Sequence, residues 1–138
     1  MEVVNQVVPT MERAMAFFGG AEDGPFVMVN LLKFKPKAEY EDGSDAHLTG
    51  AEAYARYGEG VAKLVTALGG KIRYSSTVTD LMLGEVEELW DAVALAEYPS
   101  LAAFRQMAMS PEMHAIEHHR KAGLAGQLNI KTKPGAGF

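Results

Sequence analysis

The sequence of 138 residues predicts an α+β domain, in which a four-stranded antiparallel sheet carries helices on one face. The main observation is the stretch Gly24–Phe34, whose β-branched and aromatic residues and Gly-Pro start predict a strand. Both faces of this strand are apolar, and Asn30 is the single uncharged polar residue inside it. Such a strand is typical of the centre of a sheet with cover on both sides. The second observation is the order of the other elements, which supplies helices for only one of those faces.

Residues 1–23 are predicted to form an N-terminal arm and a helix. Residues 3–8 suit a short arm or an edge strand. Pro9-Thr10 is typical of a helix start and Gly19-Gly20 of a helix end. The apolar stripe of this helix is expected to consist of Met11, Met15 and Phe18.

The stretch 35–48 is polar and is predicted to be a long loop. Loops of this length often cover a site, and a solvated insertion is the alternative. Its acidic residues lack the ligand spacing of a calcium loop. Because the stretch has almost no apolar content, we expect the fold to tolerate its replacement by a short linker.

A second helix is predicted to begin at Thr49-Gly50-Ala51-Glu52, which has the form of a capping box. Its buried stripe recurs at helical spacing and consists of Tyr54, Tyr57, Val61, Leu64 and Leu68. Gly58 and Gly60 lie inside this helix, where each costs about 1 kcal/mol relative to alanine. Close approach of another backbone, or a bend, would explain them.

Three further strands are predicted at 71–83, 89–98 and 126–132. Between the last two, Pro99-Ser100 opens a helix, and Ser110-Pro111 restarts it with a serine N-cap and a proline at the first helical position. One face of the strand 89–98 alternates large end residues with three alanines. The space so created beside Trp90 and Tyr98 suits a small apolar ligand or a closely packed neighbouring element.

The resulting order is strand, helix, strand, strand, helix, strand, which is the ferredoxin-like βαββαβ pattern with an extra N-terminal helix. We expect this domain to span residues 24–132 and a flexible tail to follow at 133–138. Since no element is left for the second face of the sheet, we expect a homodimer that packs sheet against sheet, a dimeric α+β barrel.

The composition excludes several classes of function. There is no cysteine, so disulfides and zinc–thiolate sites are excluded. The formal net charge of −5 argues against nucleic acid or an anionic membrane as a partner. The start of the chain has an early acid and no basic region, and no apolar run approaches the roughly 20 residues that span a bilayer. We therefore expect a soluble, cytoplasmic protein.

Several short segments together resemble one family. They are 27–34, Tyr54 and Tyr57, Gly69-Gly70, Trp90-Asp91, 98–100, Phe104, Met107, 110–112 and 119–124. As a set they are similar to the uncharacterised family named domain of unknown function 1330, within the dimeric α+β-barrel superfamily. The resemblance covers about Gly24 to Ile130 and implies a ferredoxin-like fold that dimerises through its sheets. That superfamily includes cofactor-free monooxygenases, isomerases, haem-degrading enzymes and proteins without known chemistry, so it implies no catalytic residue here.

Eight residues are candidates for a ligand site: Asn30, Tyr54, Tyr57, Arg73, Trp90, Asp91, His119 and Arg120. Arg120 falls on the buried stripe of its helix, where a guanidinium needs an acid such as Asp91 or a ligand anion as its partner. Asn30 and Arg73 can point toward the uncovered face of the sheet. His114 and His118 have a metal-compatible spacing but lie away from the buried stripe without a third ligand, so we expect no metal and no cofactor.

Two functions remain open. The first is a small-molecule binder, or a cofactor-free enzyme, for an aromatic or carboxylate-bearing ligand held between the sheet and a helix or between two sheets. The second is a non-catalytic dimeric module whose sheet face serves only for assembly. A pocket lined by Asn30, Trp90 and tyrosine side chains would favour the first, and a solidly packed interior the second.

Overall fold

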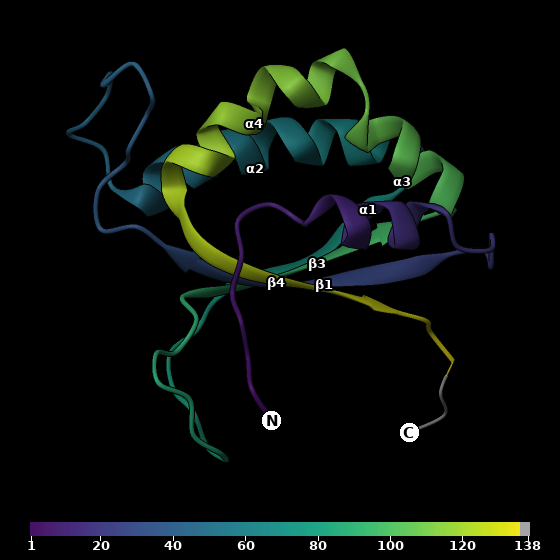
Figure 1. Ribbon diagram of the computed structural model, residues 1–138, viewed down its shortest axis with the longest axis horizontal. Helices are drawn as coiled ribbons and strands as arrows, with labels where there is room; N and C mark the ends of the chain where they lie inside the picture. The colour runs from purple at the N-terminus through teal and green to yellow at the C-terminus, as the bar shows by residue number, and fades with distance from the viewer. Residues whose placement is uncertain (136–138) are drawn as a thin grey trace.

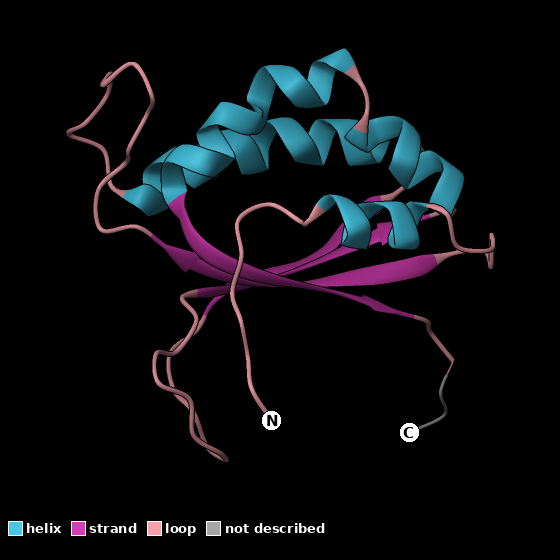
Figure 2. Cartoon of the chain, viewed as in Figure 1, coloured by secondary structure: helices cyan, strands magenta, loops and turns pink. Residues whose placement is uncertain are grey.

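The computed structural model describes residues 1–135 and confirms the ferredoxin-like α+β fold. Residues 136–138 of the expected tail lie outside the described residues. The strands are β1 (Phe26–Phe34), β2 (Lys71–Thr77), β3 (Ala92–Tyr98) and β4 (Leu124–Thr132). The helices are α1 (Met11–Phe18), α2 (Gly50–Ala67), α3 (Leu101–Ala108) and α4 (Pro111–Gly123). The antiparallel sheet has the order β2-β3-β1-β4, with the helices on one face (Figures 1 and 2).

The covered face of the sheet holds the main core. Phe26 and Met28 of β1 pack there with Tyr98 of β3, Val65 of α2 and Met107 of α3. α1 adds Phe17 and Phe18, whose rings lie against Phe104. The expected α1 stripe was therefore wrong in part, since Met11 and Met15 are exposed and only Phe18 packs.

β2 and β3 are shorter than the sequence predicted. β2 ends at Thr77 and β3 begins at Ala92, so residues 78–91 leave the sheet as an extended connection, which we call the β2–β3 arm. The sequence predicted strand to residue 83, but pairing with β3 ends at Thr77 and the side chains of Leu81–Leu83 are exposed. β4 begins earlier than expected, at Leu124, directly after α4.

Residues 35–49 form a loop that is tied to the helices. Ala38 is buried with Ala53 of α2 and Ala122 of α4. Backbone hydrogen bonds join Lys35 N–H to the Gly123 carbonyl and Glu39 N–H to the Ala122 carbonyl, at 2.8 and 3.0 Å. The loop therefore closes one end of the helical layer, and tolerance of its replacement by a short linker stays a prediction.

α2 and α4 approach each other closely at glycine positions. The capping box of Thr49 and Glu52 is present and fixes the start of α2. A Cβ built at Gly60 would lie 3.0 Å from the Ile116 side chain, so the close neighbour of this glycine is a side chain and not the expected backbone, whereas a Cβ at Gly58 would meet open space. At Gly123 a Cβ would collide with the backbone of α2.

Within residues 1–135, no helix lies over the opposite face of the sheet (Figure 1), and apolar side chains form its centre. The strand register places on it the alternate residues Val27, Val29, Leu31, Val93, Leu95, Leu128 and Ile130. We call this set the uncovered face. Most of its side chains are half-buried by their neighbours, and Ile130 is exposed.

Candidate functional site

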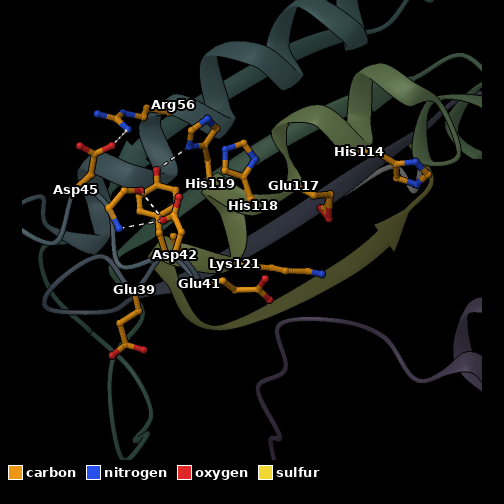
Figure 3. Close-up of a pocket in the computed structure, with 13 residues that line it drawn as sticks. Glu39, Glu41, Asp42, Asp45, Arg56, His114, Glu117, His118, His119 and Lys121 are labelled. Atoms are coloured by element: carbon orange, nitrogen blue, oxygen red, sulfur yellow. Dashed lines mark hydrogen bonds and ion pairs between the residues drawn. The ribbon is translucent and has the colours of Figure 1, made fainter.

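A hollow of about 450 Å³ lies where the 35–49 loop meets α2 and α4 (Figure 3). Its walls come from three separate parts of the chain, and nearly all of its lining residues carry polar or charged side chains. The lining residues are Glu39, Tyr40, Glu41, Asp42, Ser44, Asp45, Arg56, His114, Glu117, His118, His119, Lys121 and Ala122. We call this the loop–α4 hollow.

A hydrogen bond between a tyrosine and a histidine crosses this hollow. The hydroxyl of Tyr40, from the loop, lies 2.6 Å from Nδ1 of His119, from α4. The two rings meet edge to face, and the His118 ring lies beside that of His119 with 3.9 Å between centroids. Partial burial, helped by His118, lowers the pKa of His119 below its ordinary value near 6.5. This shift favours the neutral ring, and the tautomer with its proton on Nε2 accepts the hydrogen bond of the Tyr40 hydroxyl at Nδ1.

An ion pair fixes the outer wall of the hollow. Nη1 of Arg56, from α2, lies 2.9 Å from Oδ2 of Asp45, from the loop, as Figure 3 shows. The Asp45 carboxylate is the main reason that the pKa of Arg56 is raised, and the Tyr40 hydroxyl adds to it. Asp42 turns back to its own loop by accepting hydrogen bonds from the N–H and hydroxyl of Ser44. The ion pair thus ties this part of the loop to α2.

The charges in the lining favour a neutral or cationic ligand over an anion. Five carboxylates face two permanent cations, Arg56 and Lys121, and Asp45 already occupies Arg56. Within residues 1–135, no three histidine or acidic side chains are grouped so that they could hold a metal ion. What the arrangement can do is donate and accept hydrogen bonds through Tyr40 and His119, and pass a proton between the phenol oxygen and the imidazole.

A second polar group lies under α4 on the covered face. Nη2 of Arg120 donates to Oε1 of Gln127 at 2.7 Å, and Nε2 of Gln127 donates to Oδ1 of Asn30 at 2.7 Å. Nδ2 of Asn30 completes the chain by donating to the carbonyl of Ala94 at 3.2 Å. The chain of bonds joins α4 to three strands. Asn30 therefore points toward the helices, not toward the uncovered face as the sequence suggested.

Of the two partners expected for Arg120, an internal acid such as Asp91 was wrong, and a ligand anion stays a prediction. Asp91 lies at the other side of β1, where its carboxylate accepts from the Phe34 N–H at 2.9 Å and pairs with Nζ of Lys33 at 3.3 Å. Lys33 also pairs with Glu88 at 3.3 Å. Arg120 has the neutral amide of Gln127 in place of an acid, and among the described residues no carboxylate forms an ion pair with it.

The remaining candidates have structural contacts. The Tyr54 ring packs between Phe34 and Tyr57, and burial raises the pKa of Tyr54 to about 12. The Tyr57 hydroxyl donates to the sulfur of Met113 at 3.8 Å. Arg73 pairs with Glu97 across β2 and β3 at 2.8 Å. The indole N–H of Trp90 donates to the Asn5 side chain at 2.8 Å.

Of the eight sequence candidates, the loop–α4 hollow therefore contains only His119. Asp91 lines a second, more open hollow of about 610 Å³ beside Lys33 and the start of α2. Sequence reasoning missed Tyr40 and Arg56. Tyr40 was a usable signal, because it is the one aromatic side chain within the polar stretch 35–48.

The four-stranded antiparallel sheet with helices on one face makes this chain an α+β protein of ferredoxin-like fold. The chain belongs to the family Domain of unknown function (DUF1330), whose sequence model matches residues 44–132. No curated protein matches it in sequence.

Two crystal structures of the RPA0582 protein are similar over nearly the whole chain. The methylated protein is 36% identical, with a TM-score of 0.88 and coverage of 99% of this chain and 100% of that one. The other structure, described as a protein of unknown function from Rhodopseudomonas palustris, is 36% identical with a TM-score of 0.84, covering 95% of this chain and 98% of that one.

A more distant structure shares the fold. It comes from Bacteroides fragilis and is described as a dimeric protein of unknown function with a ferredoxin-like fold. It is 14% identical, with a TM-score of 0.52, over 82% of this chain and 99% of that one. Within residues 1–135, none of the helices has the length and apolar character needed to cross a membrane.

Proposed function

We propose that this protein binds a small polar molecule in the loop–α4 hollow. The observation that carries the proposal is the 2.6 Å hydrogen bond between Tyr40 and His119, which lies in a hollow large enough for a small ligand. Both side chains are within reach of a molecule there, and each can exchange one hydrogen bond for another. The five carboxylates in the lining make a neutral or amine-bearing molecule the favoured class.

The rigidity of the walls supports this proposal. The Arg56–Asp45 ion pair and the backbone bonds of the loop hold Tyr40 over α4 before any ligand arrives. A site formed in advance avoids the entropic cost of ordering a loop on binding. The same preorganisation suits proton transfer by the Tyr40–His119 pair, which is how the site would serve an enzyme without a cofactor.

The test combines native mass spectrometry of freshly purified protein with thermal shifts on a panel of small amines, neutral amino acids and carboxylates. A retained small molecule, or an upward shift with an amine or a neutral compound, is the expected result. Ligand at 100 times its dissociation constant should raise the melting temperature by on the order of 10 °C.

The substitution Tyr40→Phe should strongly reduce this rise in melting temperature. The matched control is Tyr74→Phe, since Tyr74 is exposed on β2 and is not one of the residues that line the hollow. No shift with any compound, or an equal shift in both variants, would contradict the proposal.

We further propose that the protein is a homodimer in which the uncovered faces of two copies pack together. The support is the row of apolar side chains on a face without helices, together with the dimeric assembly named for the Bacteroides fragilis neighbour. Sheets that pack face to face bury such rows between them. Sedimentation at micromolar concentration should give twice the mass of one chain. Leu31→Lys should give a monomer, while Met15→Lys, on exposed α1, should not.

The second candidate function is a dimeric module without a ligand site. The solidly packed covered face favours it, because Asn30 and Tyr54 are engaged with neighbouring side chains and line neither hollow. The two candidates give different results in the same experiments. A dimer that retains and binds nothing supports the module, and a compound whose effect depends on Tyr40 supports the binding protein.

A further inference from the structure

Outside the N-terminal segment, the most exposed large apolar side chains lie in the β2–β3 arm. Met82 is fully exposed, Leu83 is 89% exposed and Leu81 is 43% exposed. Within the described residues, the only hydrogen bond of residues 80–87 is local, from the Leu81 N–H to the Asp80 carboxylate at 2.8 Å. The tip of the arm therefore has no contact in the chain that explains its three consecutive apolar side chains.

The base of the arm, by contrast, is held firmly. The Val78 N–H donates to the Asp91 carbonyl at 2.9 Å, and the Asp91 N–H donates to the Leu32 carbonyl at 2.8 Å. The Trp90 indole is bound to Asn5, and Nζ of Lys33 donates to the Leu89 carbonyl at 3.0 Å. These bonds fix the direction in which the arm leaves the sheet. Figures 1 and 2 show that it descends on the side opposite the helices, which is the side of the uncovered face.

We propose that the arm tip, Leu81–Leu83, packs on a second copy of this chain and so clasps the dimer. The inference rests on the sheet-to-sheet dimer proposed above and adds a second contact to it. A second copy on the uncovered face occupies the space beside which the arm descends. Because a two-fold interface uses the same surfaces on both copies, each chain gives one arm and receives one. The apolar side chains of the arm tip are then buried in the dimer together with those of the uncovered face.

The charge of the arm also favours a second copy as its partner. Residues 78–91 contain five acidic side chains and no lysine or arginine, and only Glu88 and Asp91 among them pair with Lys33 of the same chain. Lys71 lies at the end of β2 opposite the arm, next to Arg73, which is paired with Glu97. A second copy whose strands run in the opposite direction brings Lys71 near the acidic arm of the first. The pairing is complementary in both directions, as a two-fold interface requires.

Methionine oxidation tests the clasp with internal controls. The full-length protein is treated with dilute hydrogen peroxide, and the sulfoxide at each methionine is followed by peptide mass spectrometry. Met109, which is 70% exposed at the end of α3, sets the rate of an open side chain, and the buried Met113 sets the slow limit. In the clasped dimer, Met82 should oxidise at least tenfold more slowly than Met109. In the Leu31→Lys monomer, Met82 should oxidise at least as fast as Met109.

Sedimentation of the same samples separates the two proposals. A dimer in which Met82 oxidises as fast as Met109 would overturn the clasp and leave the sheet-to-sheet dimer intact. A wild-type protein that sediments as a monomer would overturn both. A second variant, Met82→Ser with Leu83→Ser, leaves the fold untouched because both side chains are exposed in the chain, and it should weaken dimerisation at least tenfold. Unchanged dimerisation in this variant would also overturn the clasp.

Discussion

The two faces of the sheet carry similar apolar side chains in different surroundings. On the covered face, Phe26 and Leu32 are completely or almost completely buried under the helices. On the uncovered face, Val29 and Leu31 of the same strand remain half-buried. A strand with two apolar faces predicts that both faces are buried. The sequence of the chain, however, shows what packs on only one of them, namely its own helices. Substitutions in the two faces should therefore behave differently with protein concentration.

The largest expected effect comes from the covered face. Phe26→Ala removes a ring that contacts Tyr98 and Phe104, and it should lower the free energy of unfolding by about 3–5 kcal/mol at any protein concentration. Leu31→Ala is the matched change on the uncovered face, and its cost should be smaller in dilute protein than in concentrated protein. Urea unfolding at two concentrations a hundredfold apart measures both. If the stability lost in Leu31→Ala were the same at both protein concentrations, burial of the uncovered face by a second copy would be contradicted.

The next effect concerns the contact between the helices that build the cover. Gly123→Ala places a methyl group against the backbone of α2 at Gly50 and Tyr54, so it should destabilise the fold by about 1–3 kcal/mol or more. Gly58→Ala, in the interior of α2 with open space around it, should stabilise the fold by up to about 1 kcal/mol. Thermal unfolding should therefore show a lower melting temperature for Gly123→Ala and a higher one for Gly58→Ala. A stabilised Gly123→Ala protein would show that the helices can move apart.

The covered face also contains the Arg120–Gln127–Asn30 chain of hydrogen bonds. Arg120→Met leaves the buried Gln127 amide oxygen without its donor and should cost about 1–3 kcal/mol. Changing Gln127 to methionine as well removes both partners, and the double-mutant cycle then gives their coupling. If Arg120→Met instead left stability unchanged, and carboxylates raised the melting temperature of the wild type, the arginine would be a ligand contact and not a part of the cover.

The sequence predicted the fold well because its signals are local. Thr49 and Glu52 are three residues apart, so the start of α2 was visible, as was the serine cap of α4 at Ser110. The family resemblance likewise implied the ferredoxin-like fold and therefore its antiparallel sheet. The ends of β2 and β3 were missed because the alternation of side chains continues past Thr77, although the pairing of the two strands ends at Thr77 and Ala92.

The candidate site was largely missed because its contacts are distant in sequence. Tyr40 and His119 lie 79 positions apart and meet only when the 35–49 loop folds over α4. Arg120 was predicted to have an acid or a ligand anion as its partner, whereas its partner in the chain is a neutral amide in β4, seven positions further on. Periodicity assigns a side chain to a face and does not say which polar group it will meet there.

The smallest expected effect is a pH dependence at the edge of the covered layer, in the loop–α4 hollow. Because the folded state lowers the pKa of His119 below 6.5, the unfolded chain takes up a proton first as the pH falls. The contribution of His119 to stability is therefore complete above about pH 6.5 and is lost as the pH falls through its lower folded pKa. Thermal unfolding of the wild type and of His119→Gln at pH 7.5 and 5.5 isolates this contribution, since the other titrating groups are shared. The wild type should lose more stability over this interval than the variant.

The His118→Gln substitution provides a second test, because His118 helps to lower the His119 pKa. It should reduce the difference in lost stability between proteins with and without His119. Equal losses in the wild type and His119→Gln would mean that the His119 ring is as free to take a proton in the hollow as in the unfolded chain, and the Tyr40–His119 hydrogen bond would not be a fixed feature of this edge.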